Sequence, residues 1–257
     1  MRSAGILARQ VRYENLSFWR NPPAAFFTIV FPLMFLVIFN LIFGDSTVEL
    51  PGGTAGISTF YVPGIIALSV IGACYTNVAM GVAFSREQGL LKRTRGTPLP
   101  TWALLGGKVL HAVAIGVVLV VVVAAAGVLF YDVAVPTRTL PAFVLTLIIG
   151  SATFSALGLA VTAAVPNADA APAIVNASIL PLLFVSDVFI PLDDAPTWLT
   201  TFADIFPVRH FSLALQASFN PFERGAGLEP AHLGVMAVWM VASLLVATRF
   251  FRWESRR

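Results

Sequence analysis

Few side chains in this sequence could take part in chemistry, and Asp187 stands out because it interrupts an apolar stretch. It lies within residues 181–191, which read PLLFVSDVFIP. If that stretch crosses a membrane, a carboxylate near its end is a candidate functional group, because a charge at that depth is costly to keep. The same side chain could instead reach outer water or pair with Arg209. The sequence leaves both interpretations open.

Other residue combinations that support catalysis or metal binding are missing from the sequence. The three histidines, His111, His210 and His232, are scattered and form no HExxH motif. The single cysteine, Cys74, excludes a disulfide framework and a multi-cysteine metal site. We therefore predict no catalytic residue and no metal site, and interpret the histidines as packing or interfacial residues.

One short segment looks like a phosphate-binding loop but lacks two of its requirements. Gly106-Gly107-Lys108 is followed by Val109 where the motif needs Ser or Thr, and Trp102 occupies the place of its first glycine. We therefore predict that this chain binds no ATP or other cofactor. On this prediction it is not an enzyme by itself.

Composition predicts a membrane protein. Of the 257 residues, 58% are hydrophobic and 11% are charged, and the mean hydropathy is +0.85. Ordinary soluble domains carry about 25% charged residues. A soluble fold could not bury so much apolar surface, so we predict an all-α polytopic protein embedded in a lipid bilayer. The formal charge of +3 is too small to indicate a nucleic-acid partner.

Six apolar segments are predicted to cross the bilayer core of about 30 Å, which takes about 20 helical residues. Together they form a single transmembrane domain over residues 1–257. The predicted spans are 24–43, 61–84, 104–131, 140–165, 171–190 and 231–250.

Two further segments are predicted to lie at one membrane surface. Residues 3–20, within the N-terminal segment 1–23, form an amphipathic helix, because Leu7, Val11 and Phe18 share one face. Residues 85–100, SREQGLLKRTRGTPLP, form a short basic helical segment between two spans.

The segment 192–230 is apolar enough in part to suggest a seventh span. However, Asp204 and Arg209 interrupt it centrally, and each central charge costs at least about 2.5 kcal/mol. We predict an outer re-entrant piece instead, built from two short helices broken near Pro207.

The distribution of basic residues indicates the orientation. Three segments carry 13 of the 16 Lys and Arg residues, and the alternate segments carry 3. The basic segments are 1–23, 85–108 and 249–257, and the alternate ones are 44–60, 132–139 and 191–230. Because basic loops stay on the cytoplasmic side, both termini are predicted to be cytoplasmic, which requires an even number of spans.

The order of these features resembles that of the membrane subunit, or permease, of the ATP-binding-cassette type-2 exporter family, over nearly the whole chain. Four features carry the resemblance, the first being the basic amphipathic N-terminal helix. The others are REQGLLKR at 86–93 followed by Thr97-Pro98-Leu99, PLLFVSDVFIPLDDAPTWL at 181–199, and FPVR at 206–209.

The resemblance implies a coupling helix within 86–98 that docks into a separate nucleotide-binding ATPase subunit, which would hold ATP and Mg. It also implies a dimer with a second permease copy or paralogue, in the cell membrane. The partner-coupling residues would be Arg86, Glu87, Gln88, Gly89, Leu90, Lys92, Arg93, Thr97 and Pro98. The candidate residues of an outer gate or substrate path are Phe184, Asp187, Pro191, Pro207, Arg209 and His210.

Two residues depart from the family pattern. Many members have Glu where Lys92 stands and Gly where Asp187 stands. The wording RTRGTPLP at 93–100 resembles drug-resistance exporters most. The resemblance therefore implies export of a drug or antibiotic, with export of a lipid or glycolipid on the same scaffold as the alternative.

Two other classes of protein fit the sequence less well than an exporter permease. An ion- or proton-coupled carrier is expected to show charges at mid-span and broken helices in repeated positions, which are largely missing. A membrane-embedded enzyme needs a convergent set of His, Glu or Cys on the spans, which is also missing. Energy would then have to enter from a partner on the cytoplasmic side, through the segment 85–100.

Overall fold

Long apolar runs become helices in this chain because lipid offers no hydrogen-bond partner to an exposed backbone. The computed structural model describes residues 3–96, 100–192 and 195–253. Within these residues, five helices are long and apolar enough to cross a membrane. They are α2 (Pro22–Phe43), the continuous helix α3–η1–α4 (Ser58–Ile71, Gly72–Thr76 and Asn77–Glu87), α6 (Thr101–Tyr131), α7 (Leu140–Val161) and α11 (Pro230–Phe250). The predicted class, an all-α polytopic membrane protein, agrees with this architecture.

The remaining elements are short or lie outside the bundle. They are α1 (Ser3–Trp19), β1 (Thr47–Leu50), β2 (Gly53–Gly56), α5 (Leu90–Arg95), α8 (Ala171–Phe184), α9 (Thr197–Ala203) and α10 (Pro207–Phe219). The two strands form an antiparallel hairpin in which Thr47 pairs with Gly56. This hairpin was not predicted from the sequence, because its strands are only four residues long.

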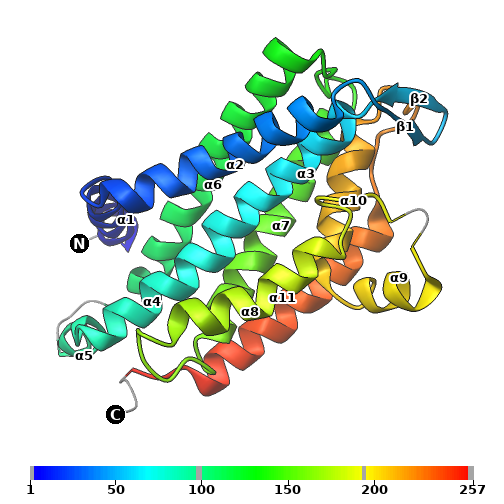
Figure 1. Ribbon diagram of the computed structural model, residues 1–257. Helices are drawn as coiled ribbons and strands as arrows, with labels where there is room; N and C mark the ends of the chain where they lie inside the picture. Colours follow the sequence, from blue (N-terminus) through cyan, green and yellow to red (C-terminus); the bar gives the residue numbers. More distant parts are fainter. Residues whose placement is uncertain (1–2, 97–99, 193–194, 254–257) are drawn as a thin grey trace.

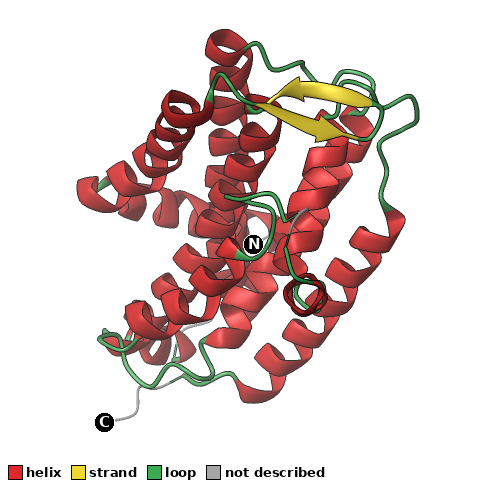
Figure 2. Cartoon of the chain, turned by 45° about the vertical axis from the view of Figure 1, so that its right-hand side comes forward, coloured by secondary structure: helices red, strands yellow, loops and turns green. Residues whose placement is uncertain are grey.

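The bundle has two chemically different ends. One end, called here the basic end, carries α1, the α4–α5 turn and the C-terminal residues, and the other, the hairpin end, carries β1–β2 and α9 (Figure 1). The described parts of the three segments rich in Lys and Arg therefore lie at the same end, as the sequence predicted (Figure 1). Figure 2 shows the hairpin covering the opposite end of the helices.

Helix α3 lies at the centre of the bundle. It contacts α2, α6, α7 and α10, so that neighbours surround it. Val62, Ile65 and Ile66 are fully buried there. Helices α2 and α11, at the periphery of the bundle, instead expose much of their apolar surface, as expected where lipid replaces protein as the neighbour.

The prediction of a fifth span over 171–190 is wrong in its helical extent. Helix α8 has 14 residues, which at 1.5 Å per residue reach about 21 Å, less than the bilayer core. Residues 185–190 form turns and bends instead. The fourth helix likewise ends at Val161, because residues 162–164 form a turn.

The segment predicted to be an outer re-entrant piece contains two short helices, α9 and α10. Helix α9 ends at Ala203 and α10 begins at Pro207, a first-turn position where the missing proline N–H is not needed. Helix α10 packs inward, and Phe211 and Leu215 are fully buried.

A very close helix crossing fixes the middle of the bundle. A Cβ atom on Gly158 of α7 would lie 2.7 Å from the Tyr75 carbonyl oxygen and 3.1 Å from that of Cys74. Both carbonyls belong to the π-helical turn η1, an irregularity that often marks functional sites. The small residue therefore sets the distance between α7 and η1.

We predict that Gly158→Ala destabilises the protein by about 1–3 kcal/mol, because the added methyl has no room beside the backbone of η1. The midpoint of thermal unfolding in detergent measures this. Gly234→Ala on α11 is the matched control, since a Cβ there meets nothing within 4 Å. Equal midpoints for the two variants would contradict the close crossing.

Candidate functional site

Residues 85–96 form a projecting corner at the basic end (Figure 1). Helix α4 ends at Glu87, and Gly89 turns the chain with φ of 66°, a left-handed conformation that glycine adopts without strain. The short helix α5 follows and is anchored by Leu91, which is fully buried with Leu104 of α6. Lys92 and Arg93 are exposed on the same helix.

The predicted partner-coupling residues separate into two groups. Gln88, Lys92 and Arg93 are exposed, Glu87 is exposed on one side, and Leu90 is half-buried. Arg86 differs, because it is 3% exposed and donates hydrogen bonds to the carbonyl oxygens of Thr162 and Val165. Its guanidinium group therefore binds within this chain, and its predicted contact with a partner protein stays a prediction. Thr97 and Pro98 lie outside the described residues.

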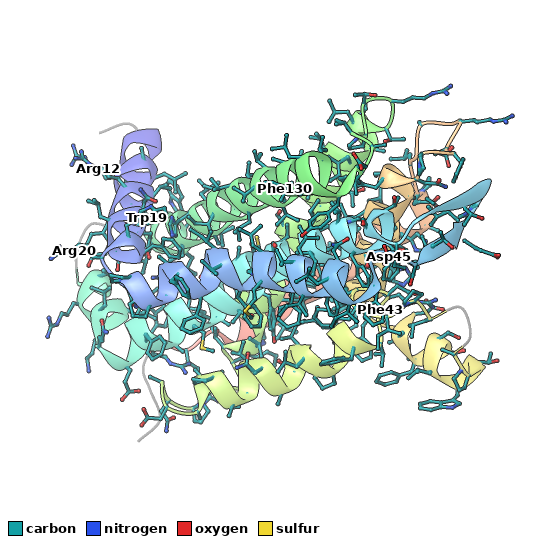
Figure 3. The ribbon with its side chains drawn as sticks, turned by 45° about the horizontal axis from the view of Figure 1, so that its top comes forward. Arg12, Trp19, Arg20, Phe43, Asp45 and Phe130 are labelled. Carbon is teal, nitrogen blue, oxygen red and sulfur yellow. The ribbon has the colours of Figure 1, made fainter. Side chains whose placement is uncertain are left out.

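Helix α1 lies across the basic end of the bundle (Figure 3). Lys108 Nζ lies 3.0 Å from Glu14 Oε1, and both side chains are largely buried. A Cβ atom on Gly107 would lie 2.2 Å from Gln10 Cγ, so glycine permits the contact. Gly106-Gly107-Lys108, which only resembled a phosphate-binding loop, thus forms the seat of α1 on α6. Beside it is a pocket of about 500 Å³ that His111 and Asn77 also line.

A second pocket of about 320 Å³ lies between α2, η1 and α8. Its wall is mainly apolar, with a few polar groups such as Asn77 and Asn176. Phe27 and Leu180 at its rim are exposed on the bundle surface. The π-helical turn η1 contributes Gly72, so an irregular backbone borders this pocket.

At the hairpin end, Asp187 and Arg209 form the ion pair that the sequence left as one of two options. Arg209 Nε donates to Asp187 Oδ2 at 2.7 Å, and the two side chains are 15% and 7% exposed. Arg209 Nη1 also donates to the more exposed Asp204 at 2.6 Å. The Asp187 carboxylate therefore does not depend on outer water for its partner.

The backbone around Asp187 explains how α8 can stop at this depth. Asp187 has φ of 53°, in the left-handed region where glycine is unstrained and Asp is tolerated. Its carbonyl oxygen accepts hydrogen bonds from Ser212 Oγ at 2.8 Å and Gln216 Nε2 at 2.6 Å. Its carboxylate also accepts the N–H of Leu192 at 2.8 Å. Groups freed by the end of the helix thus find partners inside the protein, as a low-dielectric setting requires.

The structure also joins two histidines that the sequence left scattered. His210 Nδ1 lies 2.7 Å from His232 Nδ1, and His210 Nε2 lies 2.8 Å from the Asp204 carbonyl oxygen. Because a carbonyl oxygen only accepts, His210 Nε2 carries a proton, and one of the two facing Nδ1 atoms donates to the other. This contact ties α10 to α11 beside Arg209. Among the described residues, no group of three or more His, Cys, Asp or Glu converges as a metal site would require.

Comparison with known proteins identifies the scaffold. A family model described as ABC-2 type transporter matches residues 8–220. The chain belongs to the ABC-2 type transporter family.

Two Escherichia coli K12 permeases are among its relatives. The protein named "Inner membrane transport permease YadH" is 26% identical over 225 residues, covering 85% of each chain. The protein named "Probable multidrug ABC transporter permease YbhR" is 28% identical over 153 residues, which cover 60% of this chain and 41% of YbhR. The match therefore spans about two fifths of YbhR and most of YadH.

In this ABC-2 permease the other candidate residues of the predicted outer gate lie around the break after α8. Phe184 ends α8 and is exposed, Pro191 follows the turns, and Pro207 starts α10. Sequence reasoning missed Ser212 and Gln216, although four-residue spacing on α10 places them on the same face as Val208. It also missed Glu14, the partner of Lys108.

We predict that Asp187→Asn and Arg209→Gln each lower the midpoint of thermal unfolding, and that the double variant loses less than the sum. Removing one partner leaves the other charge buried and unpaired, whereas removing both does not. The coupling energy is expected to be about 1–3 kcal/mol.

Two further variants sharpen this cycle. Asp204→Asn is the matched control and should cost less, because Asp204 has a side chain 49% exposed. Asp187→Gly should fall between wild type and Asp187→Asn, since it loses the ion pair but relieves the left-handed backbone. Strict additivity of Asp187→Asn and Arg209→Gln would rule out the coupling.

Proposed function

We propose that this chain is the membrane permease subunit of an ATP-driven exporter, in which a separate subunit binds ATP and Mg²⁺. The observation that carries the proposal is α5, a short helix that projects at the basic end, is anchored by Leu91 and exposes Lys92 and Arg93. A helix in this position is suited to bind a protein outside the membrane and to be displaced when that protein moves. Membership of the ABC-2 family supports the same conclusion.

The proposed orientation places the basic end in the cytoplasm of a cell whose plasma membrane holds the protein. Basic loops favour that side, so both termini would be cytoplasmic. A sixth crossing is then completed by α8 together with residues 185–192, although α8 alone is too short. The re-entrant piece formed by α9 and α10 enters from the outer side.

The proposed cargo is a hydrophobic or amphipathic molecule such as a drug or antibiotic. The pocket between α2, η1 and α8 suits it, because an apolar wall with a few polar groups is typical of small-molecule sites. A lipid or glycolipid is the second candidate, favoured by the exposed rim residues Phe27 and Leu180, through which a molecule could enter from the bilayer. A second permease copy would complete the transporter as a dimer.

We expect cysteines introduced at Thr47, Thr137 and Ala226 to react with a membrane-impermeant maleimide in intact cells. A cysteine at Ala8 on α1 should react only after the membrane is opened. All four positions are exposed, and a Cys74→Ser background removes the one native thiol, which is buried. Labelling of the Ala8 position from outside would reverse the proposed orientation.

We expect the double variant Lys92→Glu and Arg93→Glu to lose co-purification with the ATP-binding subunit while still reaching the membrane. The matched control, Arg138→Glu with Arg224→Glu, reverses two exposed charges in loops of the hairpin end. It should bind the subunit normally, because that end faces outward in the proposed orientation. Equal binding by both double variants would argue against α5 as the contact.

A further inference from the structure

The last two residues of α4, Arg86 and Glu87, contact the connection between α7 and α8. Their side chains carry opposite charges. Arg86 contacts the turn that follows α7, and Glu87 contacts the turn that precedes α8. Both residues come directly before Gly89 and α5. Adjacent side chains of one helix end therefore contact two other helices.

Arg86 binds the carboxyl end of α7. Its Nη1 donates to the Thr162 carbonyl oxygen at 3.1 Å, and its Nη2 donates to the Val165 carbonyl oxygen. Thr162 is the residue that caps α7, and both acceptor residues are 1% exposed. The last carbonyls of a helix lack partners within it, so the buried guanidinium satisfies the Thr162 carbonyl at the cap of α7 and also binds the Val165 carbonyl in the connection that follows.

Glu87 contacts the amino end of α8. Its Oε2 accepts the N–H of Ala168 at 3.4 Å, within the turn that leads to Ala171, the first residue of α8. In the same turn Asn167 Oδ1 accepts the N–H of Ala170 at 2.9 Å. Two N–H groups of the turn that leads into α8 thus face acceptor oxygens, one from Glu87 and one from Asn167.

The signs of the two charges match the two helix ends. A helix carries partial negative charge at its carboxyl end and partial positive charge at its amino end. Arg86 places a cation at the carboxyl end of α7, and Glu87 places an anion at the amino end of α8. Exchanging the two charges would make both contacts unfavourable.

We propose that Arg86 and Glu87 are positioning residues that carry movement of α4 and α5 to α8, and we call the pair the α4 bracket. This inference rests on the proposed function, since it assumes that a partner protein moves α5. Leu91 anchors α5 to α6 by a separate apolar contact, whereas Arg86 and Glu87 connect α4 to the segment between α7 and α8. Helix α8 lines the apolar pocket with Asn176, so its displacement changes the shape of that pocket.

The first test uses the permease alone, in lipid nanodiscs. Hydrogen exchange of the amides at 162–170 is expected to become at least tenfold faster in Arg86→Gln and in Glu87→Lys. Glu87→Gln keeps an acceptor oxygen and should show a smaller change. Arg138→Gln, an exposed residue at the hairpin end, should leave the exchange unchanged. Unaltered exchange in both Arg86→Gln and Glu87→Lys would overturn the bracket.

The second test uses the complex with the ATP-binding subunit and needs no cargo. A cysteine at Asn176, in a Cys74→Ser background, reports the pocket through its rate of maleimide modification with and without ATP. We expect ATP to change this rate by several-fold in wild type and in Arg138→Gln. In Arg86→Gln the ATP effect should be lost while ATP hydrolysis continues, and Arg86→Lys should restore it in part.

The two tests separate failure of the bracket from failure of the proposed function. If Arg86→Gln keeps the full ATP effect on the cysteine at Asn176, the bracket does not carry the movement, although the exporter assignment stands. If the wild-type permease neither binds an ATP-binding subunit nor responds to ATP, the proposed function fails and the transmission role fails with it. If ATP changes the modification rate in wild type and in Arg138→Gln but not in Arg86→Gln, the result supports the bracket.

Discussion

The hydrogen bonds that satisfy an interrupted backbone at Asp187 are the constraint on which the hairpin end of this permease depends. A helix that stops inside a membrane protein must find internal partners for the groups that it frees. Here the carboxylate binds Arg209, and the carbonyl oxygen of the same residue binds Ser212 and Gln216. All three partners belong to α10. The break in α8 therefore fixes where α10 lies, and α10 in turn covers α3 and meets α11.

The sequence predicts the long elements well because length and hydropathy are local properties. The bounds of α2, α6 and α11 lie within three residues of those expected. The extent of α8 was wrong because its apolar run continues to Ile190, while the turn at Asp187 is set by contacts with α10 far along the chain. The pairing of His210 with His232 was missed for the same reason, since it too depends on a tertiary neighbour. The hairpin was missed because its strands are only four residues long.

Several residues that belong to a recognisable sequence motif make buried polar contacts within the protein, which gives them a structural role that the motif does not indicate. Arg86 stands within a segment that resembles a docking site, yet it satisfies the end of α7 from inside. Lys108 belongs to an imperfect phosphate-binding pattern, yet it holds α1 through Glu14. The segment that leads into α8 is consequently bound by Arg86 and Glu87 at the basic end, and the segment that follows α8 is bound through Asp187 at the other end. Movement at one end has a short path to the apolar pocket that lies between them.

The claim that α8 moves together with the α4–α5 corner is tested most directly by two distances between spin labels. Both are measured in the complex with the ATP-binding subunit, first without nucleotide and then with bound ATP. One pair joins Gln88 on the α4–α5 corner to Ala173 on α8, and the other joins Ala173 to Phe26 on α2, across the pocket. The account predicts that ATP leaves the first distance unchanged and alters the second. A change in the distance from Gln88 to Ala173, with that from Ala173 to Phe26 constant, would contradict it.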